Sequence, residues 1–143
     1  MDRYQNIVRV SFYGHTHQEE FSVTKSVREG KNIGMNFITG SLTTFTNKDP
    51  SFSVMALDQD LLIPLTHQTY SLNLNKTNQN NTPVWTLLHD YASMYNLEDL
   101  SPDSFNHFSQ QVKSDVNLSL LYKWNKVKQT AHRKPTTCDA KCR

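Results

Sequence analysis

The chain has 143 residues, of which 36% are hydrophobic and 20% are charged, and its formal net charge is +2. This length fits one domain or a piece of a larger one, and so small a charge gives no support for a nucleic-acid polymer as a partner. No apolar run approaches the roughly 18 residues of a membrane span, and the N-terminal segment lacks the apolar core of a signal peptide.

The first half of the sequence predicts strands. Segments rich in β-branched, aromatic or alternating residues are separated by turn signals such as Gly30. In the last of them, Tyr70 and Leu72 alternate with Ser71, which predicts a half-buried strand with the serine on its wet face. No helix is predicted between the strands to cover a second face, so we expect the sheet to need another packing partner. The predicted strands cover residues 6–13, 20–23, 33–40, 51–58 and 70–75.

The pattern changes after the polar segment 75–82, which we interpret as a loop and as the best internal boundary. Thr82 followed by proline is a helix start signal, and apolar residues at helical spacing run from residue 84 to residue 95. Ser101 before proline repeats the signal, and a third helix is predicted over residues 115–129. Strands followed by three helices indicate an α+β fold.

The motif GHTH places two histidines, His15 and His17, directly after the first predicted strand. Residues i and i+2 of an extended chain share a face, and a turn at Gly14 can aim both imidazoles at one point. Neutral imidazole nitrogens suit zinc and similar metals, whereas the alternative is an exposed pair in a loop. Glu19 and Glu20 could add oxygen ligands, although two adjacent acids are more often a solvated loop.

The remaining histidines and the cysteines give weaker signals. His89 and His107 fall in predicted helices, where we interpret them as surface residues, and no catalytic triad or glycine-rich phosphate loop can be recognised. Cys138 and Cys142 are spaced too widely for a C-x-x-C redox motif. A small disulfide loop and two exposed thiols are both open interpretations on spacing alone.

Five segments, in order along the chain, carry a resemblance to one family. They are FYGHTHQEEF, GSLTTFTNKDPSFSV, YSLNLNKTN, PVWTLLHDYASMYNLEDLSPDSFNHF and the terminal CDAKCR. The first resembles the last metal-binding motif of calcineurin-like metallophosphoesterases. Together they resemble the acid sphingomyelinase and sphingomyelinase-like phosphodiesterase family. GHTH alone is shared by many metallophosphoesterases, whereas the ordered set is far more specific.

The resemblance implies that this chain is the C-terminal part of such an enzyme. Residues 1–76 would be the last strands, about four or five, of the layered metallophosphoesterase β-sandwich. Residues 77–143 would be a helical C-terminal subdomain with three helices. In the family, Asp-x-His, Gly-Asp and Asn-His-Asp motifs complete a two-metal centre, and none of them occurs in this sequence. The missing N-terminal part of the same enzyme would supply them.

The resemblance also implies roles for single residues. His15 and His17 would be ligands in a centre that holds two zinc ions when complete, and no catalytic acid is expected in this chain. Phe45 falls where relatives often place a tyrosine near the substrate, so Phe45 and Thr44 are substrate-proximal candidates. The alternative for Phe45 is a packed aromatic at a strand end. The implied substrate is sphingomyelin, cleaved to ceramide and phosphocholine, or a related phosphodiester or nucleotide. The alternative is a catalytically inactive truncated paralogue that acts as a binding module.

Secretion is a further implication of the resemblance. It favours a Cys138–Cys142 disulfide and an extracellular or lysosomal location, although this chain carries no signal peptide. Glycosylation sequons occur at Asn75, Asn80 and Asn117, a number that chance alone would give for this composition. We expect the first on the wet face of a strand, the second in the polar loop and the third on a helix.

Overall fold

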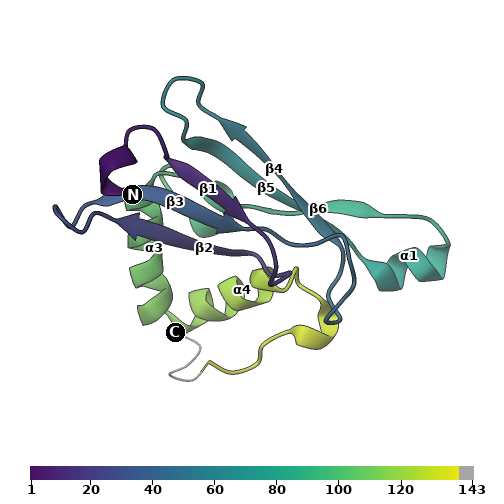
Figure 1. Ribbon diagram of the computed structural model, residues 1–143. Helices are drawn as coiled ribbons and strands as arrows, with labels where there is room; N and C mark the ends of the chain where they lie inside the picture. The colour runs from purple at the N-terminus through teal and green to yellow at the C-terminus, as the bar shows by residue number, and fades with distance from the viewer. Residues whose placement is uncertain (139–143) are drawn as a thin grey trace.

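The computed structural model describes residues 1–138, and its first sheet contains three strands in the order β1-β3-β2 (Figure 1). These strands are β1 (Val10–Tyr13), β2 (Glu20–Lys25) and β3 (Asn32–Ile38). The central strand β3 runs parallel to β1 and antiparallel to β2. β3 is the most buried strand of this sheet, because it has a hydrogen-bonded neighbour on each side and a helix against one face.

The second sheet is antiparallel throughout, in the order β4-β5-β6. Its strands are β4 (Ser51–Leu57), β5 (Pro64–Leu72) and β6 (Trp85–Asp90). In β5 the buried side chains include Ser71, whereas the neighbours Tyr70 and Leu72 are only partly buried. The face predicted to be exposed to solvent is therefore buried. Burial of Ser71 is tolerated because its hydroxyl donates a hydrogen bond of 3.1 Å to the Pro50 carbonyl.

The four helices are α1 (Leu74–Asn80), α2 (Tyr91–Tyr95), α3 (Pro102–Ser114) and α4 (Val116–Lys126), with short 3-10 turns at Asp2–Tyr4 and Ala131–Arg133. Side-chain oxygens of Asn73, Ser101 and Asp115 cap the first turns of α1, α3 and α4. Figure 1 shows α3 and α4 on one side of the sheets and α1 projecting from one end. α3 contacts β2 and β3, so it covers a face of the first sheet.

Two sequence predictions in the middle of the chain are wrong. The segment 75–82, predicted as a loop, lies largely in α1, because Asn73 accepts a hydrogen bond from the Lys76 amide and starts the helix. The helix predicted over 84–95 is instead β6 followed by the short helix α2. Backbone pairing of β6 with β5 decides this segment, and it overrides the helical spacing of the apolar residues.

The helices predicted after Ser101 and over 115–129 are present as α3 and α4, and the α+β class is confirmed. The three-helix subdomain and the complete sandwich are not confirmed in this chain. The division at residue 77 stays a prediction, and β6, which follows that boundary, shares a sheet with β4 and β5. None of the helices within residues 1–138 combines the length and apolar character needed to cross a bilayer.

The core is an aromatic cluster between α3 and the two sheets. Phe37 on β3 is fully buried, with its ring 5.5 Å from that of Phe105 on α3 and 5.0 Å from that of His67 on β5. One side chain therefore joins both sheets and a helix. The other buried members are Met35, Tyr91, Tyr95, Leu100 and Phe108.

Candidate functional site

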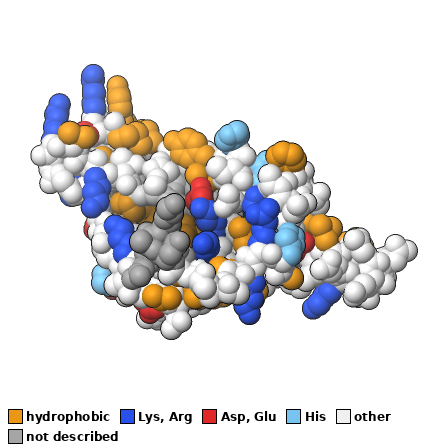
Figure 2. Space-filling view, turned by 90° about the horizontal axis from the view of Figure 1, so that it is seen from below, with side chains coloured by type: hydrophobic (Ala, Val, Ile, Leu, Met, Phe, Trp, Pro, Cys, Tyr) orange, Lys and Arg blue, Asp and Glu red, His pale blue; other side chains and the backbone are white. Residues whose placement is uncertain are grey.

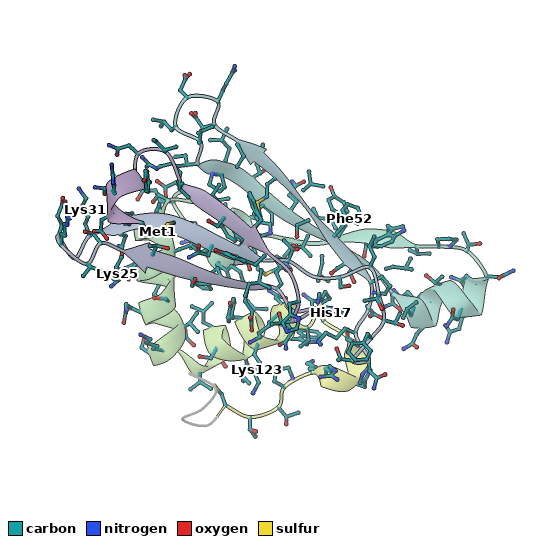
Figure 3. All side chains as sticks on the ribbon, in the orientation of Figure 1. Met1, His17, Lys25, Lys31, Phe52 and Lys123 are labelled. Atoms are coloured by element: carbon teal, nitrogen blue, oxygen red, sulfur yellow. The ribbon has the colours of Figure 1, made fainter. Side chains whose placement is uncertain are left out.

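The GHTH loop follows β1 at the end of the first sheet, where it approaches the end of α4 (Figure 3). His15 has a φ of 85° and His17 a φ of 55°, both in the left-handed region that disfavours side chains other than glycine. Such backbone persists only where surrounding contacts hold it, and it is often found at functional sites. His15 is exposed to solvent, whereas His17 is half-buried.

The imidazole of His17 has a buried nitrogen without a partner within residues 1–138. Its Nδ1 is buried and has no hydrogen-bond partner among the described residues. The ring centroid lies 5.8 Å from that of Phe45, in an edge-on arrangement. An unpartnered buried nitrogen is costly unless a ligand or water reaches it, so His17 is suited to accept one.

Phe45 lies beside the GHTH loop, but its side chain is not packed into the protein. Phe45 is 69% exposed in the loop between β3 and β4, so the alternative of a packed aromatic at a strand end is wrong. Thr44 is exposed beside it and lines a cavity of about 280 Å³ together with Lys48 and Asp49. Phe45 therefore contacts the loop of interest, whereas Thr44 faces a separate polar cavity.

Lys128, just after α4, holds the backbone of the GHTH loop. Its side chain is buried, and Nζ donates a hydrogen bond to the His17 carbonyl. Burial lowers the pKa of Lys128 to about 8, against the opposing attraction of Glu19. The loop has a second contact with this region: the Glu19 amide donates a 3.0 Å hydrogen bond to the carbonyl of Lys126.

Glu19 is buried, so the prediction of a solvated acidic loop is wrong for it. Its Oε1 accepts hydrogen bonds from Thr69 at 2.8 Å and from His89 Nε2 at 3.0 Å, and His67 Nε2 lies 3.8 Å away. Burial alone would raise the pKa of Glu19, but the hydrogen bond from His89 and the attraction of both histidines hold it below its usual value. Burial lowers the pKa of His67 to about 4.

Sequence reasoning missed this buried cluster and the lysine contact. His89 was predicted on a helix surface, but it is buried in β6. Glu19 is separated by 50 residues from Thr69 and by 70 from His89, and Lys128 by 111 from His17. No local spacing signals contacts of that kind, because they depend on how the two sheets and α4 come together.

Imidazole nitrogens are a ligand type that zinc accepts, so His15 and His17 are candidates for that role. Within residues 1–138 no group of three or more His, Cys, Asp or Glu side chains is arranged to hold a metal ion. A catalytic zinc ion usually has three protein ligands. The described part of the chain thus offers two candidate ligands, one of which has an unpartnered buried nitrogen, and does not by itself form a two-metal site.

The candidate modification sites are all on the surface where the structure describes them. Asn75, Asn80 and Asn117 are exposed. The first two lie in α1, which corrects their predicted placement on a strand and in a loop, and the third lies in α4 as predicted. Cys142 lies outside the described residues, so its pairing with Cys138 stays a prediction.

The surface beside the GHTH loop is basic. Gln18, directly after His17, lines a hollow of about 350 Å³ together with Lys123, Lys126 and Arg133, of which Lys126 forms an ion pair with Glu20. Seen from below, Lys and Arg side chains are spread over this side of the molecule and Asp and Glu are sparse (Figure 2). A surface of this sign attracts anionic ligands.

The relatives of this chain are phosphodiesterases, which places it in a phosphodiesterase-like family. Residues 34–143 match the family model described as the acid sphingomyelin phosphodiesterase C-terminal region. The chain belongs to this family, and the resemblance noted in its motifs is confirmed.

Three relatives show the range of the similarity. Sphingomyelin phosphodiesterase B of Dictyostelium discoideum is 32% identical over 125 residues, which are 82% of this chain and 20% of the relative. Sphingomyelin phosphodiesterase of Homo sapiens is 27% identical over 147 residues, 99% of this chain and 23% of the relative. A cyclic GMP-AMP phosphodiesterase of Homo sapiens is 23% identical, over 99% of this chain and 32% of the relative. The chain thus spans between a fifth and a third of these proteins.

Proposed function

We propose that this chain is the C-terminal portion of a metal-dependent phosphodiester hydrolase like the sphingomyelin phosphodiesterases. The observation that carries the proposal is the GHTH loop after β1, with an exposed His15 and a half-buried His17, in a chain of this family. The two imidazoles would be ligands of a zinc pair. The other ligands and the acid for the leaving group would belong to polypeptide outside this chain.

The chemistry supplied by bound zinc would be activation of a water molecule and polarisation of the phosphoryl oxygen. This chain's own residues would act around that centre. His15 and His17 offer imidazole nitrogens, Phe45 forms an apolar edge beside His17, and the basic hollow next to Gln18 attracts the anionic phosphodiester. Sphingomyelin is the substrate we propose first, because most of the relatives are sphingomyelin phosphodiesterases, and a nucleotide phosphodiester is the second.

Location and covalent modification follow from the same proposal. An extracellular or lysosomal enzyme would carry a Cys138–Cys142 disulfide and glycans at some of Asn75, Asn80 and Asn117. All three asparagines are exposed, which such modification requires. Residues 1–76 would belong to the metallophosphoesterase domain and residues 77–143 to the C-terminal subdomain.

Zinc binding by the 143-residue chain tests the metal role. Two imidazoles should bind Zn²⁺ weakly in isothermal titration calorimetry, and His17→Ala should remove that binding. The exposed His107→Ala variant should keep it. A chromogenic phosphodiester should not turn over with added zinc, because two ligands do not build the centre. Equal zinc affinity in wild type and His17→Ala overturns the metal role, and turnover lost in His15→Ala overturns the inference that the site is incomplete.

A catalytically inactive binding module is the alternative function, and the absence of a third ligand among residues 1–138 favours it. The coding sequence upstream of Met1 separates the two. In-frame Asp-x-His, Gly-Asp and Asn-His-Asp motifs there support the hydrolase. A stop codon and a promoter at that place support the module.

A further inference from the structure

We propose that Lys128 is a positioning residue for the GHTH loop, holding the His17 carbonyl so that the His17 imidazole keeps one orientation. The inference rests on the proposed role of His17 as a metal ligand. Whether Lys128 holds the GHTH loop in place is a separate question from metal binding, and it is measured on the metal-free protein.

The contact itself is buried and non-local. Lys128 is 2% exposed, and its Nζ donates to the His17 carbonyl across 111 residues of sequence. A charged donor makes a stronger hydrogen bond than a neutral one, and a buried ammonium needs such an acceptor. His17 itself has a positive φ of 55°, a backbone conformation that is unfavourable for a residue other than glycine and that surrounding contacts must hold.

Gly40 has no side chain where the Lys128 side chain passes on its way to the GHTH loop. A Cβ atom at Gly40 would lie 2.5 Å from Lys128 Cε and 3.2 Å from Nζ, and it would also meet the Ser51 hydroxyl. The φ of Gly40 is not positive, so its backbone conformation does not require glycine. Close approach of the lysine and serine side chains is the physical reason that a glycine suits this position.

The end of α4 holds the same segment at a second point. The Glu19 amide donates to the Lys126 carbonyl at 3.0 Å, and the Glu19 carboxylate is fixed by Thr69 and His89. Residues 17–19 are therefore held on one side by the segment after α4 and on the other by the second sheet. Of these contacts, the one from Lys128 lies at His17 itself.

Nuclear magnetic resonance of the metal-free 143-residue chain tests the positioning. Lys128→Met replaces the charged side chain by an unbranched apolar one that cannot donate the hydrogen bond. It should shift the resonances of the His17 carbonyl carbon and ring. Gly40→Ala should also shift them, because the added methyl group would meet Lys128 Cε at 2.5 Å as well as the Ser51 hydroxyl at 1.9 Å. Lys25→Met is the control, since Lys25 is exposed on β2 and lies far from His17 (Figure 3). Unchanged His17 resonances in both test variants overturn the proposal, and Gly40→Ala decides alone if Lys128→Met does not fold.

Cobalt binding links this result to the proposed function. With Co²⁺ as the only added metal, Lys128→Met and Gly40→Ala should weaken the apparent Kd by about tenfold, the worth of one hydrogen bond. Lys25→Met should stay within about twofold of wild type. Shifted resonances with an unchanged Kd overturn the link to metal binding. If His17→Ala binds Co²⁺ as wild type does, the proposed metal role fails, while the metal-free resonances still decide the positioning.

Discussion

At the scale of single residues, a few buried polar groups determine how the candidate loop is held. Glu19 is fixed by Thr69 and His89, and Lys128 is fixed by the His17 carbonyl. His67 is different, because both of its ring nitrogens are buried without a hydrogen-bond partner among the described residues. Its ring instead stacks on that of Tyr91 at 4.5 Å. His67 therefore behaves as a neutral aromatic side chain of the core.

The neutral state of His67 predicts acid sensitivity. Its pKa is about 4 in the folded protein, against 6.5 for an ordinary histidine. Between these values the unfolded chain binds more protons, so the free energy of unfolding falls as the pH decreases from 6.5 to 4, by up to about 3 kcal/mol. The loss levels off below pH 4 for this group, whereas Glu19, whose pKa is lowered from 4.5, begins to add its own loss as the pH falls below about 4.5.

Urea unfolding of wild type and His67→Phe across this pH range measures the effect. The variant should show a much smaller pH dependence between 6.5 and 4, and a stability within about 1.5 kcal/mol of wild type at pH 7. His107→Gln should keep the wild-type slope, because His107 is exposed. If His67→Phe retains that slope as well, another group causes the acid sensitivity.

At the scale of elements, side-chain caps decide where the two long helices begin. Ser101 accepts a hydrogen bond from the Ser104 amide at 3.3 Å. Asp115 accepts from the amides of Asn117 and Leu118 at 2.8 and 3.1 Å. These satisfy amides that have no partner within the helix, and the aspartate charge also suits the positive end of the helix dipole.

The cap of α4 is expected to contribute measurably to stability. Asp115→Ala should lower the free energy of unfolding by about 1 kcal/mol, because two amides lose their acceptor. Asp115→Asn keeps the acceptor oxygen, so its free energy of unfolding should fall by only about 0.3 kcal/mol. Thermal melts followed by circular dichroism compare the three proteins. A loss in the alanine variant no larger than in the asparagine variant would show that the cap contributes nothing.

At the scale of the whole molecule, two small sheets are joined by aromatic packing with α3. Phe37 contributes to this junction from the central strand of the first sheet, against His67 of the second sheet and Phe105 of the helix. Each sheet has only three strands, so neither has a large face of its own to bury. The junction is therefore expected to hold the molecule together as one cooperative unit.

Truncation of Phe37 tests this junction. Phe37→Ala should lower the free energy of unfolding by about 3 to 5 kcal/mol, because it leaves a cavity among three elements. Phe12→Ala is the matched control, since Phe12 stacks on Phe37 from β1 but is 50% exposed, and it should cost about 1 kcal/mol. Equal losses in denaturant unfolding would mean that the centre of the core lies elsewhere.

Local signals in the sequence determined much of the framework. The first four strands follow from β-branched and aromatic runs bounded by turn residues, and α3 and α4 follow from their caps and apolar spacing. The fifth was predicted over 70–75 but is β5, Pro64–Leu72, so only its last three residues were predicted. The place of His15 and His17 after β1, and the family of the chain, were also evident from quoted motifs. Such features depend on residues within a few positions of each other.

Only the tertiary structure decided the rest. β6 is a strand because it pairs with β5, although its apolar spacing favours a helix. Glu19 is buried because Thr69 and His89 meet it from the second sheet, and His17 is held because Lys128 reaches it past Gly40. These contacts join residues 50 to 111 positions apart, and their free energy depends on packing and desolvation that no short stretch of sequence contains.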